Sequence, residues 1–374
     1  MPNTALIIGG GPAGLATAIA LARLRIGAVV VERTAYEDLR VGEHLAPAGV
    51  LQLRALDAGS HLRLDSHGVS AGVDAYWGSE TASYMDYFRY PGQRGVNLSR
   101  PRFDAELARA CERSGATVLR EASLLHADPG ASGWDVSVAV NGNTRHFPVG
   151  LIVDASGRAA TFARRQGARV RAEDRQIAIV CFADHVEGGT DTRSTVETVE
   201  TGWWYSAPIG TERRIVMFMT DDDLLPKEQD RHAWWLRELA RTTRLPHGFR
   251  EANGFREANG FREDRVPGGL VLRSARSQHL DAMCGTNWLA VGDAAMAFDP
   301  LSSQGIVKAF DHAFRAASSI AAHFAGDAHA PQRLASVLEA EYAAYRATQA
   351  RYYRIETRWR ASPFWQRRHA ESAA

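Results

Sequence analysis

Three glycines near the N-terminus have the spacing of a phosphate-binding turn. Gly9, Gly11 and Gly14 fill the glycine positions of a GxGxxG pattern. In this pattern the first glycine permits a tight turn, the second lets the backbone approach a pyrophosphate, and the third lets a helix pack on a strand. We expect the whole turn, with Pro12 and Ala13, to contact the ligand. The phosphates would lie at the positive N-terminus of the helix that follows.

The flanking residues predict the elements that must position this turn. Ala5–Ile8 has a buried-strand pattern, Leu15–Leu24 is rich in helix-forming residues, and Ala28–Glu32 predicts a second strand. Glu32 ends that strand about 20 residues beyond the turn, where a carboxylate can accept hydrogen bonds from ribose hydroxyls. Glu32 and the adjacent Arg33 are therefore predicted cofactor contacts. The order of elements indicates a dinucleotide-binding domain and does not separate FAD from NAD.

A second group of residues that could contact a polar ligand lies in the last third of the chain. Asp293 follows a predicted strand that begins at Trp288, and Pro300 precedes a predicted helix that begins at Gly305 and Ile306. A strand ending in Gly-Asp and a second helix N-terminus both suit a polar ligand. Capping of a helix by Asp293 is the alternative interpretation.

Four segments, in this order along the chain, resemble the para-hydroxybenzoate hydroxylase superfamily, which includes the tryptophan halogenases. They are the GxGxxG turn, Arg100–Asp104, Val153–Arg158, and the Gly-Asp segment with Asp299–Ile306. The resemblance implies FAD as the cofactor, with Arg100 near it and Asp293 on its ribityl or pyrophosphate oxygens. A solvated position at the start of a helix is the alternative for Arg100.

The loop Gly42-Glu43-His44, which follows Arg40, resembles the loop that reaches the flavin in this superfamily. The resemblance implies that Arg40 contacts the cofactor and that Glu43 and His44 are the catalytic acid/base groups. An exposed or merely hydrogen-bonded His44 is the alternative.

The expected fold class is α/β (α+β overall), with a Rossmann-type FAD-binding domain, an antiparallel-sheet substrate domain and a C-terminal helical tail. Short apolar strands alternate with polar turns from about residue 175, as in an antiparallel sheet that covers a flavin. The expected boundaries are 1–170 and 275–325 for the FAD-binding domain, 171–274 for the substrate domain and 326–374 for the tail.

Two segments outside these motifs have their own patterns. A tandem hexapeptide repeat at 248–263 predicts an expanded loop, because its unit is too short for a solenoid. Ser336–Arg358 predicts a long amphipathic helix. The aromatic and arginine residues after it, up to Arg368, are expected to cover the dinucleotide-binding domain or to face a partner.

Three consecutive aromatic residues lie in a predicted strand of the substrate domain. We expect Trp203, Trp204 and Tyr205 to contact an aromatic substrate, since alternate side chains of a strand point to opposite faces. Core packing is the alternative. The segment partly resembles the tryptophan-halogenase motif GWxWxIP, but Tyr205 replaces the second tryptophan. Halogenases also use a lysine in their N-terminal half, whereas the only lysines of this chain are Lys227 and Lys308.

The GEH loop, the DPLSSQGI segment and the tail from Tyr352 to Arg368 are most similar to flavoproteins that mature quinone-cofactor amine oxidases and dehydrogenases by hydroxylating a peptidyl tryptophan. The resemblance implies an FAD-dependent monooxygenase that transfers oxygen from a flavin C4a-hydroperoxide to an aromatic ring. The alternatives are a halogenase-like enzyme, a double-bond reductase similar to geranylgeranyl reductases, and a non-enzymatic binding protein for a partner enzyme.

The expected substrate is a small aromatic molecule or a protein or peptide that carries tryptophan, with the precursor of a partner enzyme as a candidate partner. Because the chain has one dinucleotide fingerprint, NAD(P)H would bind transiently as the reductant, or reduced flavin would come from a partner reductase.

Composition excludes several other classes. The formal net charge is +1, and no like-charged run interleaves with aromatic residues, which argues against nucleic acid. Cys111, Cys181 and Cys284 lie far apart, so we expect three buried, reduced thiols and neither disulfides nor a metal site. The start lacks a secretory signal and no segment has about 20 consecutive apolar residues, so a cytoplasmic protein without a membrane span is expected.

Overall fold

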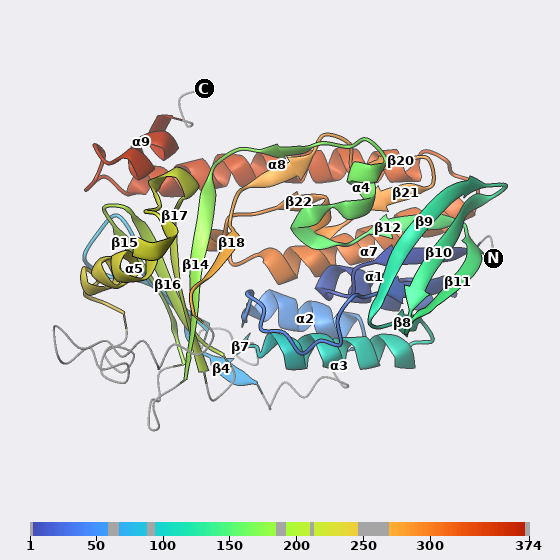
Figure 1. Ribbon diagram of the computed structural model, residues 1–374, viewed down its shortest axis with the longest axis horizontal. Coiled ribbons are helices and arrows are strands. Elements are labelled where there is room, and N and C mark those ends of the chain that lie inside the picture. The colour runs from blue at the N-terminus through green and yellow to red at the C-terminus, as the bar shows by residue number, and fades with distance from the viewer. Residues whose placement is uncertain are drawn as a thin grey trace. The chain divides into compact units, whose positions relative to one another are not determined.

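The computed structural model describes residues 3–58, 67–87, 94–184, 192–209, 213–245 and 269–370. The predicted loop at 248–263 lies outside the described residues. The chain divides into two compact units (Figure 1). The first unit comprises Met1–Leu64, Arg100–Ala172 and Ser277–Ala344, and the second comprises Asp65–Ser99, Glu173–Arg276 and Tyr345–Ala374.

A mostly parallel sheet forms the centre of the first unit. Its six strands, in spatial order, are β20 (Cys284–Gly285), β21 (Trp288–Ala290), β12 (Leu151–Asp154), β1 (Thr4–Ile8), β2 (Gly27–Val31) and β8 (Thr117–Leu119). All neighbours pair in parallel except β20 with β21. Because β1 is central, its apolar residues from Ala5 to Ile7 are fully buried. The predicted strand, turn, helix and strand at the N-terminus are therefore present.

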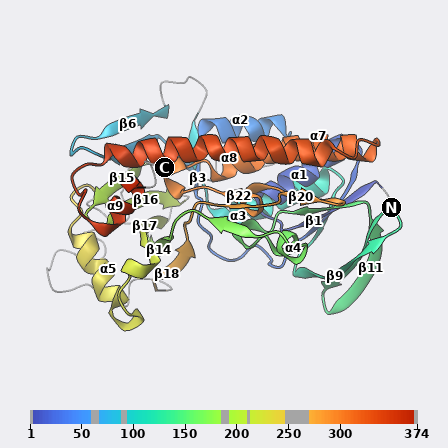
Figure 2. The same cartoon turned by 90° about the horizontal axis from the view of Figure 1, so that it is seen from above.

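Helices and smaller sheets complete the first unit. The helices are α1 (Pro12–Arg23), α2 (Pro47–Ala55), α3 (Arg100–Arg113), α4 (Thr161–Arg165), α7 (Gly305–Phe324) and α8 (Ala330–Ile355), which ends in the second unit. The remaining strands are β3 (His44–Leu45), β9 (Ala122–Gly130), β10 (Gly133–Val140), β11 (Asn143–Val149), β13 (Val170–Ala172), β19 (Gln278–Leu280) and β22 (Met296–Ala297). The sheet of β9, β10 and β11 forms the end of this unit that lies near the N-terminus (Figures 1 and 2). Small residues let α1 pack closely, and it contacts both α3 and α7.

A seven-stranded sheet forms the second unit. Its strands, in spatial order, are β18 (Val271–Ser274), β14 (Gln176–Asp184), β17 (Arg213–Asp221), β16 (Gly202–Ile209), β15 (Ser194–Val199), β5 (Gly72–Tyr76) and β6 (Ser83–Asp86). Only β5 and β15 pair in parallel. The unit also contains the antiparallel pair β4 (Gly68–Ser70) and β7 (Gly95–Asn97). The predicted α/β fold class, with a largely antiparallel sheet in addition to the parallel one, is confirmed.

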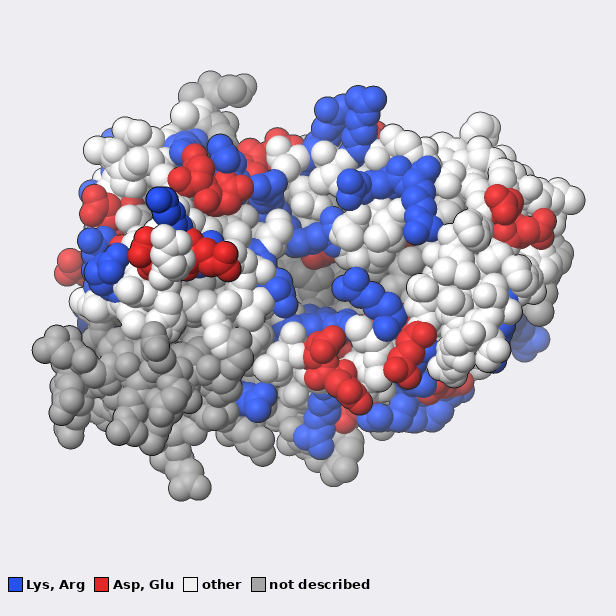
Figure 3. Space-filling view, in the orientation of Figure 1, with Lys and Arg blue, Asp and Glu red and all other residues white. Residues whose placement is uncertain are grey.

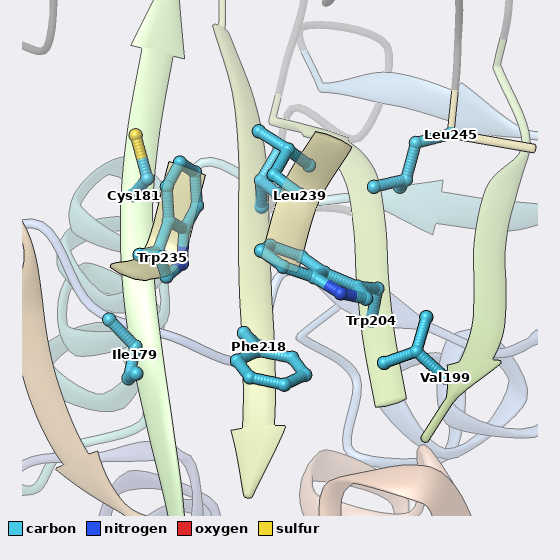
Figure 4. Packing of buried hydrophobic residues seen from close by; sticks show 9 residues of the cluster. Ile179, Cys181, Val199, Trp204, Phe218, Trp235, Leu239 and Leu245 are labelled. Atoms are coloured by element: carbon cyan, nitrogen blue, oxygen red, sulfur yellow. The ribbon is translucent and has the colours of Figure 1, made fainter. Parts of the chain in front are cut away.

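One face of this sheet packs against helix α5 (Arg231–Ala240). Trp204 stacks on Phe218 with ring centroids 4.6 Å apart and meets Trp235 of α5 edge-on at 5.2 Å (Figure 4). Ile179 and Leu239 pack in the same cluster. Trp204 is therefore a core residue of the second unit.

The C-terminal helix α9 (Pro363–Ala370) packs on the second unit. The Trp365 indole N–H donates to Val199 O at 2.9 Å, and Arg368 donates to Asp221 and to Gln176 Oε1. The predicted helical tail is confirmed. The expectation that these aromatic and arginine side chains cover the dinucleotide-binding domain or face a partner is corrected for Trp365 and Arg368, because both are buried against the sheet of the second unit.

Acidic and basic side chains are interspersed over the face shown in Figure 3. Within the described residues, no helix has the length and apolar character needed to cross a membrane. Cys111 and Cys181 are buried free thiols, whereas Cys284 is only partly buried, which corrects the expectation for that residue.

The ion pair of Asp221 and Arg368 predicts a large stability effect. Both side chains are buried, so Asp221→Asn removes the carboxylate that pairs with the Arg368 guanidinium and should lower the free energy of unfolding by about 3 kcal/mol. The control is Asp223→Asn, which removes a more exposed partner of Arg367 and should cost less than about 1 kcal/mol. Chemical denaturation measures both. Equal losses would show that the buried pair has no special role.

Candidate functional site

The glycine turn between β1 and α1 is shaped by close backbone contacts. Gly9 has φ +108°, and a Cβ there would lie 2.3 Å from Ala155 O. A Cβ at Gly14 would lie 2.0 Å from Gly9 O, whereas one at Gly11 would meet no described atom within 4 Å. Among the described residues, no side chain caps the start of α1 and none in its first turn is acidic. The turn thus leaves space beside Gly11, and no described side chain competes with an anion for the positive start of α1.

Glu32 lies beside this turn and is buried. Its Oε2 accepts the Gly10 N–H at 2.8 Å, and its Oε1 accepts from the N–H and hydroxyl of Thr34 and from Arg40. A carboxylate oxygen can accept more than one hydrogen bond, so Oε2 retains acceptor capacity for a ligand hydroxyl. The adjacent Arg33 is exposed.

A charged network connects Glu32 to the loop that carries Glu43 and His44. Arg40 lies 3.3 Å from Glu32 Oε1 and 3.6 Å from Asp104 Oδ2. Asp104 is buried and also accepts two hydrogen bonds from Arg100. Arg100 in turn donates to Val41 O at 2.6 Å. The structure thus brings the predicted residues Glu32, Arg40 and Arg100 together through Asp104.

Glu43 and His44 are both buried, at 2% and 7% exposure. Glu43 Oε2 accepts the N–H of Gly42, which has φ +95° and whose Cβ would lie 2.7 Å from an Arg100 nitrogen. Burial lowers the pKa of His44 to about 4. The imidazole is therefore neutral at pH 7. A solvent-exposed His44 is wrong, whereas the choice between a catalytic and a merely hydrogen-bonded His44 stays a prediction.

The Gly-Asp turn forms the second half of the site. Gly292 has φ +60°, and a Cβ there would lie 2.7 Å from the Ala13 Cβ at the start of α1. Asp293 Oδ1 accepts from Lys308 Nζ at 2.8 Å, and Arg158 approaches its Oδ2 to 3.8 Å. Burial acts to raise the pKa of Asp293, but the charges of Lys308 and Arg158 outweigh it and the pKa is lowered. The Asp293 side chain remains 38% exposed, so it can accept a ligand hydrogen bond.

Asp293 and Asp154 have different roles in the structure. The cap position of the short 3-10 helix η8 (Gly292–Ala294) is Val291, so Asp293 is not its capping residue. Asp154, by contrast, accepts from Ser156 and from the N–H groups of Phe162 and Ala163. Its carboxylate therefore organises the chain at the start of α4.

The segment before α7 positions Pro300, Gly305 and Ile306. Pro300 begins the 3-10 helix η9 (Pro300–Ser302), Ser303 has φ +49°, and Ile306 is buried. In the described part of the chain, no side chain caps the start of α7, and a Cβ at Gly305 would meet nothing within 4 Å. A second open helix N-terminus therefore accompanies the Gly-Asp turn.

The predicted aromatic residues lie in the second unit. Trp203 and Trp204 are fully buried and Tyr205 is 7% exposed. The Trp203 indole donates to the Tyr353 hydroxyl and meets Trp77 edge-on, so it packs under the C-terminal segment. Contact of these residues with a substrate stays a prediction.

The described residues fit an FAD. The open space at Gly11 accommodates a pyrophosphate, Glu32 can accept ribose hydroxyls, and the exposed part of Asp293 can accept a ribityl hydroxyl. FAD supplies the redox chemistry when bound. Each predicted contact of an individual residue with FAD stays a prediction.

Sequence reasoning missed three residues of this site. The sequence places Asp104 at the end of a motif but gives it no role. Lys308 entered only as a lysine outside the N-terminal half, and no pattern indicates His312. His312 Nδ1 accepts the Gly292 N–H at 3.0 Å. The i, i+4 spacing of Lys308 and His312 on a predicted helix is a weak signal that both face the same neighbour.

The sequence matches the family described as FAD binding domain over residues 3–350. It is 28% identical to a putative FAD-dependent oxidoreductase, LodB of Marinomonas mediterranea, covering 99% of this chain and 97% of the relative. It is 25% identical to a tryptophan 2-halogenase of Chondromyces crocatus, covering 86% of this chain but only 62% of the halogenase.

Solved structures share the fold. The flavin-dependent halogenase CmlS superposes with a TM-score of 0.80 at 21% identity, covering 98% of this chain and 68% of CmlS. The peptidyl tryptophan dihydroxylase QhpG, described as essential for tryptophylquinone cofactor biogenesis, superposes with a TM-score of 0.78 at 23% identity, covering 98% and 79%.

Two glycine substitutions separate ligand binding from folding. Gly11→Ala should change the unfolding free energy of the apoprotein by less than about 0.5 kcal/mol. It should weaken the affinity for FAD at least about tenfold, because its methyl group enters the open space at the turn. Gly14→Ala should instead destabilise the apoprotein by roughly 2 kcal/mol through overpacking. Denaturation and flavin fluorescence titration measure the two effects. An unchanged FAD affinity in Gly11→Ala would contradict this site.

Burial of His44 predicts a pH-dependent stability. Between the unfolded pKa of 6.5 and the folded pKa of about 4, the unfolded state binds more protons, so stability is lost as pH falls through this range. Between pH 7 and pH 5 this residue should cost the apoprotein about 2 kcal/mol. His44→Gln should remove that part of the loss, and the exposed control His126→Gln should not. Urea denaturation at both pH values tests the difference, and identical losses would refute it.

Proposed function

Because this chain belongs to the FAD binding domain family and uses FAD as its cofactor, we propose that it is an FAD-dependent monooxygenase. Its substrate would be an aromatic ring, with a peptidyl tryptophan of a quinone-cofactor enzyme as the specific candidate. The observation that carries the proposal is similarity over 99% of this chain and 97% of a putative FAD-dependent oxidoreductase, together with the fold shared with a peptidyl tryptophan dihydroxylase.

The distribution of lysines favours hydroxylation over halogenation. The halogenase-like alternative requires a lysine in the N-terminal half, and the chain has only Lys227 and Lys308. Lys308, the lysine of the first unit, is buried and paired with Asp293. It is therefore not available to an oxidised halogen species.

The first unit would bind FAD and the second would bind the substrate. In this proposal the glycine turn, including Pro12 and Ala13, holds the pyrophosphate, and Glu32 holds the ribose. Asp293 and the start of α7 hold the ribityl and flavin end. Arg40 and Arg100 both form ion pairs with Asp104, and Arg100 also donates to Val41 O. In this proposal their main role is therefore to hold the loop before Glu43. FAD, when bound, supplies the activation of dioxygen.

Glu43 and His44 are the proposed proton-handling groups. Hydroxylation of an aromatic carbon ends with loss of a proton from that carbon. A neutral buried imidazole has a lone pair that can accept this proton, and its low pKa favours rapid release afterwards. Glu43 is next to it in sequence and is also buried, and its carboxyl group is the second candidate for moving this proton.

Of the three predicted aromatic residues, Tyr205 is the proposed substrate contact. Trp204 packs under α5 on one face of the sheet, and Trp203 packs against Trp77 and Tyr353 on the other. Tyr205 shares the face of Trp203 but lies two residues further along the strand. The reductant would be NAD(P)H that binds transiently or reduced flavin from a partner reductase.

Labelled dioxygen tests the proposed reaction. With reduced FAD and a tryptophan-containing peptide, the product should carry one labelled oxygen atom per hydroxylation, and added chloride or bromide should not change its mass. His44→Gln should lower turnover about a hundredfold or more while FAD remains bound. The control His126→Gln should turn over normally.

Three outcomes would count against the monooxygenase proposal. Halogenated product would support the halogenase-like alternative. Reduction of an unsaturated substrate without incorporation of label would support the double-bond reductase. Binding of FAD that cannot be reduced would support a non-enzymatic role for a partner enzyme.

A further inference from the structure

Two side chains of α7 hold successive residues of the Gly-Asp turn. Lys308 and His312 are one helical turn apart, so they project from the same side of α7. Lys308 Nζ donates to Asp293 Oδ1 and to Met296 O, and it lies 4.3 Å from the centroid of the Phe298 ring. These three contacts match the three N–H bonds of an ammonium group.

His312 fixes the neighbouring residue through one tautomer. The Gly292 N–H can only donate, so the Nδ1 that accepts it at 3.0 Å carries no proton. Nε2 then carries the proton and lies 3.4 Å from Glu341 Oε1 of α8. Burial lowers the pKa of His312 more strongly than Glu341 raises it, which favours this neutral form.

The turn needs such support because its backbone is unusual and polar. Gly292 has φ +60°, and its N–H lies in the interior, where an unpaired donor is costly. Asp293 presents one oxygen to the buried Lys308 while the side chain stays 38% exposed. Without Lys308 this carboxylate would be able to rotate and share both oxygens with solvent.

We propose that Lys308 and His312 are positioning residues of the cofactor site, which hold Gly292 and Asp293 in the shape that binds FAD. Glu341 orients His312 from α8. Neither α7 residue has to touch the cofactor, because each acts through the turn. The inference rests on FAD binding and is independent of the hydroxylation proposed above.

A pocket beside α7 gives this proposal a sharp test. It has a volume of about 540 Å³ and is lined by Phe298, Val307, Lys308 and Glu341, among others. Because Lys308 lines it, truncation to alanine opens a space that a small solute can enter. Lys308→Ala lacks three methylene groups and the ammonium group, which together correspond to propylammonium.

The experiment measures FAD affinity by fluorescence titration, with no turnover involved. Lys308→Ala should weaken FAD roughly ten- to a hundredfold. Propylammonium should restore most of the affinity, and the neutral propan-1-ol should not. Lys308→Met should bind FAD as weakly as Lys308→Ala, but propylammonium should not rescue it, since the methionine side chain fills the same space. Asp311→Asn, in the same pocket but paired with Arg315, should bind FAD normally.

The role of His312 is tested with variants that keep or remove the acceptor of the Gly292 N–H. His312→Asn keeps an acceptor near the Nδ1 position and should bind FAD within about threefold of wild type, whereas His312→Leu should weaken it about tenfold. The proposal is overturned if Lys308→Met binds FAD within about twofold of wild type, or if propan-1-ol rescues Lys308→Ala as well as the amine does. If Lys308→Ala does not fold, Lys308→Met and the His312 pair still decide the question. These outcomes leave the hydroxylation assay unaffected.

Discussion

The convergence of three backbone segments at the N-terminus of α1 is the constraint on which the cofactor site depends. Gly14 packs against Gly9 O, Gly9 packs against Ala155, and Gly292 packs against Ala13, at separations that leave no room for a further methyl group. Side chains are thus kept out, and backbone N–H groups face the position where the phosphates would bind. The Glu32 carboxylate is hydrogen-bonded to Gly10 of the first segment, and the Gly-Asp turn is itself one of the three segments, so this close packing also fixes their positions.

Three carboxylates hold side chains and loops in place around this backbone arrangement. Glu32 and Asp104 are buried, and each is matched by donors on both oxygens, while Asp293 is matched by Lys308 on one side. A buried charge without partners is costly, so the positions of Arg40 and Arg100 are determined by Asp104 and Glu32. Such pairs contribute little net stability, but they select one geometry. The loop with Glu43 and His44 is one result of that selection.

Features encoded by neighbouring residues could be predicted, and those made by distant pairs could not. The turn and its flanking elements follow from glycine spacing and local hydrophobic patterns, although α1 begins at Pro12 rather than Leu15 because proline suits the first helical turn. Lys308 and His312 were missed because their partners lie 15 and 20 residues away in a different element. Trp365 was expected to cover the dinucleotide-binding domain or to face a partner, since composition alone does not show which sheet will cover a helix. FAD could be predicted as the cofactor because several motifs occur along the chain in the order that the resembled superfamily has. The substrate depends on the residues that line its binding site, and no motif describes them.

The near absence of lysine has a practical consequence for studying this protein in solution. The chain carries 44 basic Lys and Arg residues, of which only Lys227 and Lys308 are lysines. Lys308 is buried with its ammonium group fully engaged, whereas Lys227 is exposed. Amine-reactive reagents should therefore modify, apart from the α-amino group, a single side chain in the second unit. The native protein thus already carries one addressable lysine side chain for a fluorophore or a surface linker, in a different unit from the Gly-Asp turn and the residues that hold it.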